Sequence, residues 1–90
     1  MKPLLDVLVI LDALEKEGSF AAASAKLYKT PSALSYTVQK LESDLNIQIL
    51  DRTGHRARFT RTGQMLLEKG RDVLHTVREL EKQAVKLHQG

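Results

Sequence analysis

One stretch of the chain, TPSALSYTVQKLESDLN at residues 30–46, indicates the fold more clearly than any other. Thr30 can cap a helix, and Pro31 suits its first position, where a missing N–H has no cost. Apolar residues then recur at steps of four, three and four and form one narrow stripe: Leu34, Val38, Leu41 and Leu45. This pattern predicts an amphipathic helix over 31–45 whose stripe faces a core.

The opposite face of this helix carries hydrogen-bonding groups and one aromatic ring. Its residues, called the recognition face below, are Ser32, Ser35, Tyr36, Gln39, Lys40 and Ser43. We expect no carboxylate here, because Glu42 and Asp44 fall nearer the core edge and the far end. A solvated face usually mixes both signs of charge, whereas hydroxyl and amide groups suit a polyanion with base edges. The positive helix start beside Thr30 also favours a phosphate group.

Two further helices are expected before residue 30. The first runs from about Pro3 to Glu17, ends at Gly18, and has an apolar stripe of Leu4, Leu8, Leu11 and Leu14. Ser19 can cap a short second helix. The expected buried face of that helix comprises Phe20, Ala23 and Leu27. Three helices with a tight turn at 28–30 predict a helix-turn-helix.

The hydrophobic period changes after Asn46, which indicates a hairpin over residues 48–60. A short extended run of Ile47, Ile49 and Leu50 is followed by a turn at 53–57 and a second run at 58–60. Such a hairpin beside a helix-turn-helix is called a wing. The expected fold is therefore mainly α: a three-helix head, a short two-stranded wing and a long C-terminal linker helix.

The positive charge of the chain is concentrated in this wing. The formal net charge is +3, but residues 1–18 carry −2 and residues 48–61 carry +3. Every base in 48–61 is an arginine: Arg52, Arg56, Arg58 and Arg61. Arginine suits bidentate contacts to phosphates or base edges. A solvated basic loop remains the plain alternative.

Length and composition argue against several other classes of protein. Ninety residues make one small domain, and the absence of cysteine excludes disulfides and cysteine-ligated zinc. The longest apolar run, 7–11, is far shorter than the roughly 20 residues of a membrane span. Asp72, His75 and Glu79 share a helix face but lack a second source of ligands. We therefore expect no catalytic residues, no metal, no cofactor and no membrane partner.

The last helix is expected to run from residue 61 to about 88, with Thr60 as its cap. Its apolar residues alternate steps of four and three and form the heptad seam: Leu66, Gly70, Val73, Val77, Leu80, Ala84 and Leu87. About 28 residues give a rod roughly 42 Å long, too long for so small a chain to cover. Self-association through this seam is expected, with docking on the chain's own head as the alternative. The expected division is a head at 1–60 and a linker and dimerisation helix at 61–90.

The order and spacing of several motifs resemble the DNA-binding region of LysR-type transcriptional regulators over essentially the whole chain. The matching residues are Gly18-Ser19-Phe20, Ala22-Ala23, Leu27, Thr30-Pro31-Ser32-Ala33-Leu34-Ser35, Leu41-Glu42, Ile49-Leu50-Asp51-Arg52 and Thr60-Arg61-Thr62-Gly63. Two positions depart from the family's pattern. Asn46 stands where glycine is usual, and it also tolerates a left-handed helix stop. Tyr36 stands where arginine is frequent, which implies weaker reading of guanine.

The resemblance implies a bacterial, cytoplasmic, nucleoid-associated protein that binds promoter or operator DNA as a homodimer. The implied contacts to phosphates and base edges come from Ser19, Thr30, Pro31, Ser32, Ser35, Tyr36, Gln39, Lys40, Arg52, Arg56 and Arg58. The implied antiparallel dimer interface comprises Leu66, Val73, Val77, Leu80, Ala84 and Leu87. It further implies a tetramer in the full-length protein, and an effector bound by a domain absent from this chain. A protein-interaction module with an incidental basic wing is the alternative function.

Overall fold

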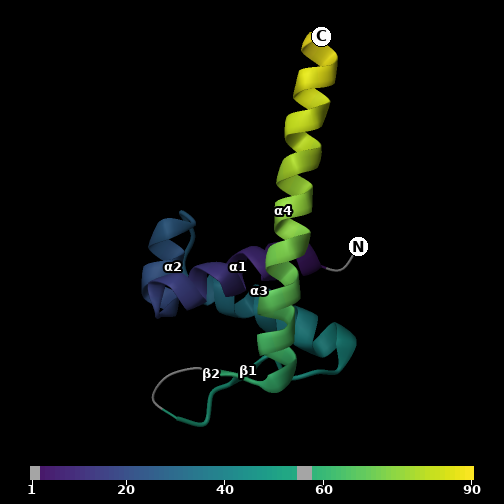
Figure 1. The fold of residues 1–90 in the computed structure, drawn as a ribbon. Helices are drawn as coiled ribbons and strands as arrows, with labels where there is room; N and C mark the ends of the chain where they lie inside the picture. Colours follow the sequence, from purple (N-terminus) through teal and green to yellow (C-terminus); the bar gives the residue numbers. More distant parts are fainter. Residues whose placement is uncertain (1–2, 55–57) are drawn as a thin grey trace.

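The computed structural model describes residues 3–54 and 58–90 (Figure 1). The elements follow in the order α1 (Leu4–Glu17), α2 (Phe20–Lys26), α3 (Pro31–Leu45), β1 (Leu50–Asp51), β2 (Arg58–Phe59) and α4 (Arg61–Gln89). The two short strands pair antiparallel, with Leu50 opposite Phe59. The predicted fold class is thereby confirmed: a mainly α winged helix-turn-helix with a long C-terminal helix.

Side-chain caps fix the starts of three helices. The hydroxyl oxygens of Ser19, Thr30 and Thr60 accept hydrogen bonds from the N–H groups of Ala22, Ala33 and Gly63, at 3.1, 3.1 and 3.0 Å. Each cap satisfies a backbone donor that the first turn of a helix leaves unpaired. All three were expected from the sequence.

Left-handed residues end the first and third helices. Gly18 stops α1 with φ of 87°, and Asn46 stops α3 with φ of 55°. Asn46 thus makes the left-handed helix stop that was expected of it from the sequence. The start of α1 differs slightly from the prediction, because Pro3 lies at the N-cap and the helix begins at Leu4.

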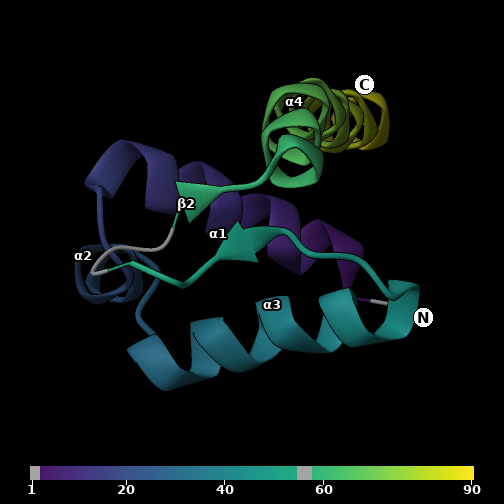
Figure 2. The ribbon, with the colours of Figure 1, turned by 90° about the horizontal axis from the view of Figure 1, so that it is seen from below.

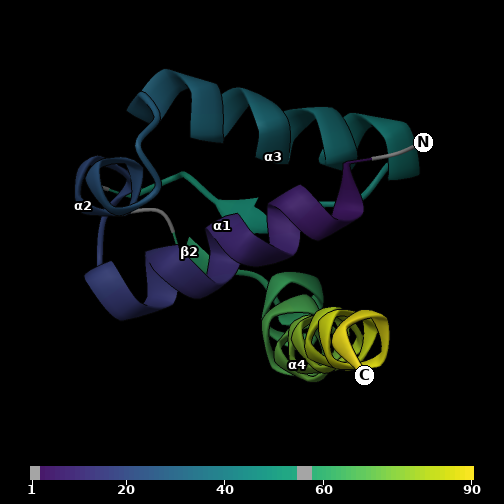
Figure 3. The same ribbon diagram turned by 90° about the horizontal axis from the view of Figure 1, so that it is seen from above.

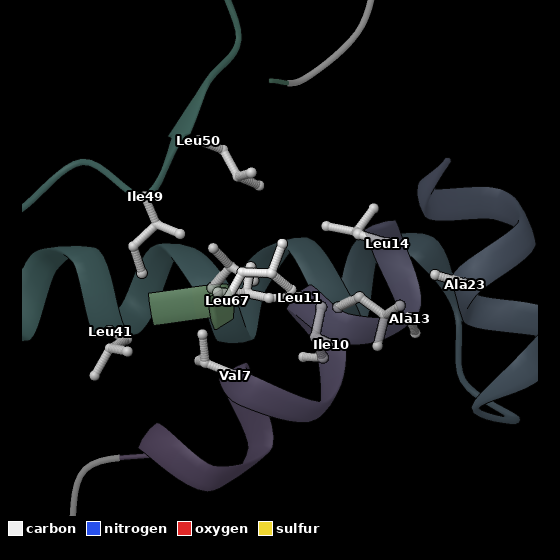
Figure 4. Close-up of a cluster of buried hydrophobic side chains, with 12 residues drawn as sticks. Val7, Ile10, Leu11, Ala13, Leu14, Ala23, Leu41, Ile49, Leu50 and Leu67 are labelled. Atoms are coloured by element: carbon white, nitrogen blue, oxygen red, sulfur yellow. The ribbon is translucent and has the colours of Figure 1, made fainter. Parts of the chain in front are cut away.

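The core lies where α1, α2 and α3 meet the first strand of the wing and the start of α4 (Figure 4). Fully buried aliphatic side chains dominate it: Val7, Leu11, Ala23, Leu34, Val38, Leu41 and Ile49. Burial of this apolar surface is the main stabilising term for the fold. Ile49 and Leu50 belong to the same cluster, so the root of the wing is anchored in the core.

The structure corrects the predicted apolar faces at four positions. Leu4 is 40% exposed, because the first turn of α1 lies outside the core. Leu45 is 41% exposed, because Leu41 is the last side chain of α3 in the core and the chain turns away one turn later. Phe20 and Leu27 are half-buried and pack against the edge of the core. In a helix as short as α2, only the small Ala23 and its neighbour Ser24 are fully enclosed.

Helices α3 and α4 lie on opposite sides of α1, as the two end-on views agree (Figures 2 and 3). The first part of α4 packs against α1 and β2, and its later turns extend away from the head (Figure 1). The outer face of α3 is therefore remote from α4. Within the described ranges, no helix is both long enough and apolar enough to cross a bilayer.

Candidate nucleic-acid interface

The recognition face is formed as expected on the outer side of α3. Ser32, Tyr36, Gln39 and Lys40 are exposed, and Ser35 is half-buried. The Gln39 Nε2 donates a hydrogen bond to the Ser35 hydroxyl over 3.3 Å, so these two side chains hold one another. The face therefore offers hydroxyl, amide, ammonium and phenol groups on one helix surface.

The N-terminal end of α3 adds an electropositive point to this face. Thr30 and Pro31 are exposed, and the first turn contains no acidic residue. The Thr30 and Ser32 hydroxyl oxygens lie 3.4 Å apart at this end. Hydroxyl groups beside a helix start suit a phosphate, because the dipole and free N–H groups favour an anion.

The far end of the recognition face differs from the prediction. Asp44 lines a shallow surface hollow together with Tyr36, Gln39, Lys40 and Ser43. The Lys40 Nζ lies 3.8 Å from the Asp44 Oδ1, one helical turn away. The expectation of a face without carboxylates is therefore wrong at this end, because a helical step of four brings Asp44 beside Lys40.

The two strands of the wing are shorter than the extended runs that the sequence predicts. Ile47 and Ile49 precede β1, and Thr60 follows β2 as the cap of α4. Arg58 lies exposed on β2, opposite Asp51. The predicted contact residue Arg56 lies outside the described residues.

A local turn follows β1. The Asp51 carboxylate accepts hydrogen bonds from the Thr53 hydroxyl (2.7 Å) and the Thr53 N–H (3.0 Å). These two bonds stabilise the charged form and lower the pKa of Asp51 below its ordinary value. The acid that faces Arg58 across the hairpin therefore remains ionised at neutral pH.

Arg52 connects the wing to the third helix. Its Nη1 lies 3.3 Å from the Glu42 Oε1. The Arg52 side chain is 34% exposed, so about two thirds of its surface is covered. Of the predicted contact residues, Ser19 is exposed on the head at the start of α2, where its hydroxyl serves as the helix cap.

Two residues at this surface were not identified from the sequence. Glu42 contacts both Arg52 and the backbone of the wing; the Leu41-Glu42 motif was noted, but its spacing gives no hint of the partner. Tyr28 is almost fully exposed in the turn before α3, with a left-handed φ of 57°. The turn itself was predicted, but nothing in the local sequence marks a tyrosine at positive φ.

The heptad seam divides between two environments. Leu66 packs against the core, and Gly70 is buried under Leu8, so the start of the seam belongs to the head. Beyond it, Val73, Leu80, Ala84 and Leu87 are exposed and Val77 is half-buried. The first turns of α4 therefore dock on the chain's own head, as the alternative expectation stated.

A second apolar face of α4 makes this contact. It comprises Gly63, Leu67, Gly70 and Leu74, called the docking face below. Sequence reasoning missed Leu67 and Leu74, which are one position away from seam residues. The signal was present as a second, shorter apolar stripe beside the heptad seam.

Comparison with known proteins places this arrangement in a family. A sequence model described as "Bacterial regulatory helix-turn-helix protein, lysR family" matches residues 5–64. YeeY, an uncharacterized HTH-type transcriptional regulator of Escherichia coli K12, is 90% identical over the whole chain. YhaJ of the same strain, a probable HTH-type transcriptional regulator, is 49% identical over 86 residues. The chain spans 29% of the length of each of these two relatives.

Ser43-Asp44 and residues 54–58 of the sequence resemble YhaJ in particular, and YhaJ is among the relatives that match. YeeY is nevertheless much more similar to the chain than YhaJ is.

Solved structures share the fold. A DNA-binding domain of BenM in complex with catB site 1 DNA has a TM-score of 0.87 and 28% identity, and the match covers 96% of this chain and 97% of that one. A CbnR DNA-binding domain in complex with DNA has a TM-score of 0.81 and 24% identity, over 92% and 95% of the two chains. The second match bears on the fold alone.

Proposed function

The chain belongs to the lysR family of bacterial regulatory helix-turn-helix proteins, and on that premise we propose that it binds double-stranded DNA sequence-specifically for a transcriptional regulator. The family is one of regulatory proteins and not of enzymes. The observation that carries the proposal is the recognition face, exposed on the side of the head away from α4. The match to the BenM domain, whose structure is a DNA complex, supports it.

Helix α3 would enter the major groove, which is about 12 Å wide and admits one α-helix. Thr30, Pro31 and Ser32 would meet phosphates and base edges where the helix begins, and Ser35 would bind phosphate. Further along the groove, base or phosphate contacts would come from Tyr36, Gln39 and Lys40. Without an arginine at position 36, we expect Tyr36 to pack on a thymine methyl group or bind a phosphate.

The wing would extend the contact beside the groove. Arg52, Arg56 and Arg58 would bind phosphates or the neighbouring minor groove, and Ser19 would bind a phosphate at the start of α2. Phosphate contacts release counterions, so affinity should fall steeply with salt. Sequence preference would come from α3 and from the shape of the duplex.

We further propose that residues 61–90 pair the heads 1–60 into a homodimer. The distal part of the heptad seam, Val73 to Leu87, carries exposed apolar side chains that an antiparallel partner helix would cover. Two recognition helices would then lie in successive major grooves, about 34 Å apart, on an interrupted palindrome. A protein-interaction module is the second candidate, favoured by these same exposed side chains. Tetramer assembly and an effector domain would belong to the full-length regulator, in the bacterial cytoplasm at the nucleoid.

The test begins with selection of bound duplexes from a random pool, which yields a probe and reports half-site spacing. Ser35→Ala and Arg52→Ala should each weaken binding to that probe at least tenfold while the dimer mass is retained. The matched variant Val77→Glu with Leu80→Glu should give a monomer with weak DNA affinity. Binding that does not weaken between low and high salt, or normal binding by both alanine variants, would overturn the DNA-binding function.

A further inference from the structure

Glu42 makes more contacts to other elements than its position on α3 would suggest. Its side chain is only 11% exposed, next to the buried Leu41. The Oε2 accepts hydrogen bonds from the backbone N–H groups of Ile49 (2.7 Å) and Leu50 (3.2 Å). The Oε1 accepts one from the Arg52 Nη1 (3.3 Å). One carboxylate thus joins the recognition helix to the root of the wing and to its first arginine.

These contacts leave most of the N–H donors of Arg52 without an acceptor among the described residues. The group has five N–H donors, and among the described residues only Glu42 accepts from it, through one nitrogen. The remaining donors are held in a fixed plane, and that plane suits two phosphate oxygens. Because the side chain is already largely covered, little rotamer entropy remains to be lost on binding.

We propose that Glu42 is a positioning residue for DNA: it orients the Arg52 guanidinium and fixes the wing relative to α3, so that groove and phosphate contacts are made in one register. The inference rests on the proposed DNA-binding function. Two other roles are distinguishable from it. Glu42 could act only as a fold contact, independent of Arg52, or its charge could compete with phosphate for the arginine.

The test is a double-mutant cycle on the whole chain, with the duplex selected from the random pool as the probe. Glu42→Gln keeps the shape and one acceptor oxygen but removes the charge that holds Arg52. We expect it to weaken binding about tenfold in the wild-type background and less than twofold in the Arg52→Ala background. If Glu42→Gln lowers the DNA affinity by the same factor in both backgrounds, Glu42 has a fold role alone and the positioning role is overturned.

Glu15→Gln provides the control, since it removes an exposed carboxylate on α1, outside the recognition face and the wing. Its DNA affinity should be unchanged. If Glu42→Gln binds more tightly than the wild-type chain, Glu42 competes with phosphate and the inference is wrong. Thermal unfolding and dimer mass of each variant check that the head remains intact.

A second variant keeps the test decisive if Glu42→Gln does not fold. Arg52→Lys retains the positive charge at a side chain outside the core but loses the planar group that Glu42 orients. It should weaken binding at least fivefold, and wild-type affinity would overturn the inference. If the wild-type chain selects no duplex at all, the proposed function itself fails; a bound duplex with independent losses rejects only the positioning role.

Discussion

The two halves of α4 share one heptad seam but lie in different surroundings. In the first half, Leu67 is 2% exposed, and the docking face packs on α1 and the wing. In the second half, Leu87 is 85% exposed and no residue after Leu74 is buried. A regular heptad pattern therefore does not by itself say which turns lie against the head.

One helix thus carries two offset apolar faces, one of which packs on the head while the other is largely exposed. The docking face and the heptad seam share Gly70, where α4 crosses α1 against the Leu8 side chain. After Leu74, only the seam continues to repeat apolar residues. The docked half fixes where the helix leaves the head, and the free half offers a surface to a second chain.

The largest effect in this comparison should come from Leu67→Ala. Removing a fully buried leucine leaves a cavity at the centre of the core, with a cost of about 3 kcal/mol in the free energy of unfolding. Val85→Ala, a truncation of an exposed apolar side chain in the free half and outside the heptad seam, should alter it by less than about 0.5 kcal/mol. Urea unfolding at one fixed protein concentration measures both, and equal losses would mean that the two halves do not differ.

An intermediate effect is expected from glycines on the docking face. A Cβ at Gly63 would collide with the carbonyl oxygen of Ile49, a backbone atom that cannot move aside. Gly63→Ala should therefore cost about 2 kcal/mol of unfolding free energy through strain.

Gly70→Ala is the contrasting change. Its Cβ would meet the Leu8 Cδ2 at 2.6 Å, the far end of a flexible side chain. The gain in helix propensity, about 1 kcal/mol, offsets much of this crowding. The urea midpoint should therefore fall clearly for Gly63→Ala and little for Gly70→Ala; the reverse order would contradict the packing described here.

The smallest effect should come from the ion pair beside the crossing. The Arg71 Nε donates to the Asp12 Oδ1 over 2.9 Å, and the Lys16 Nζ lies 3.1 Å from the Asp12 Oδ2. Partial burial works to raise the pKa of Asp12, but the hydrogen bonds and charges of Arg71 and Lys16 outweigh it and lower the pKa below 3.8. Asp12→Asn should cost about 0.5–1 kcal/mol at pH 7.

The pH dependence of this effect follows from the lowered pKa. Stability supplied by the Asp12 carboxylate is fully present above the unfolded pKa of about 3.8 and is lost as the pH falls through the lower folded value. The difference in unfolding free energy between the wild-type chain and Asp12→Asn should therefore become smaller below about pH 4. Asp72→Asn on the exposed side of α4 is the control; a gap that persists undiminished at pH 2.5 would exclude the ion pair as its source.

Much of the fold could be predicted from the sequence, because it depends on interactions between residues close together in the chain. Ser19, Thr30 and Thr60 act on N–H groups three residues away, and Asn46 stops α3 through its own backbone angles. The stripe of α3 was readable for the same reason, since the helical period alone brings its members together. The last buried position of this stripe, Leu41, could not be predicted, because it depends on how far the neighbouring elements extend along α3.

Only part of the candidate interface could be predicted from the sequence. The polar character of the recognition face follows from helical spacing, but the same spacing also brings Asp44 beside Lys40, which the expectation of a face without carboxylates did not include. The hydrogen bond between Arg52 and Glu42 joins residues that are ten positions apart in the sequence, and the chain changes direction between them at Asn46. No local pattern predicts such a contact, because it depends on the path of the chain into the wing.

Local sequence was enough to define the elements of this protein: four helices, three of them with side-chain caps, a basic hairpin, and an apolar repeat along the last helix. These follow from interactions within a few residues, where the period and the capping groups decide the outcome. Local sequence did not define which face of α4 packs on α1, nor which groups donate hydrogen bonds to the Glu42 carboxylate. Both depend on surfaces from distant parts of the chain, and burial rewards the arrangement only once those surfaces have come together.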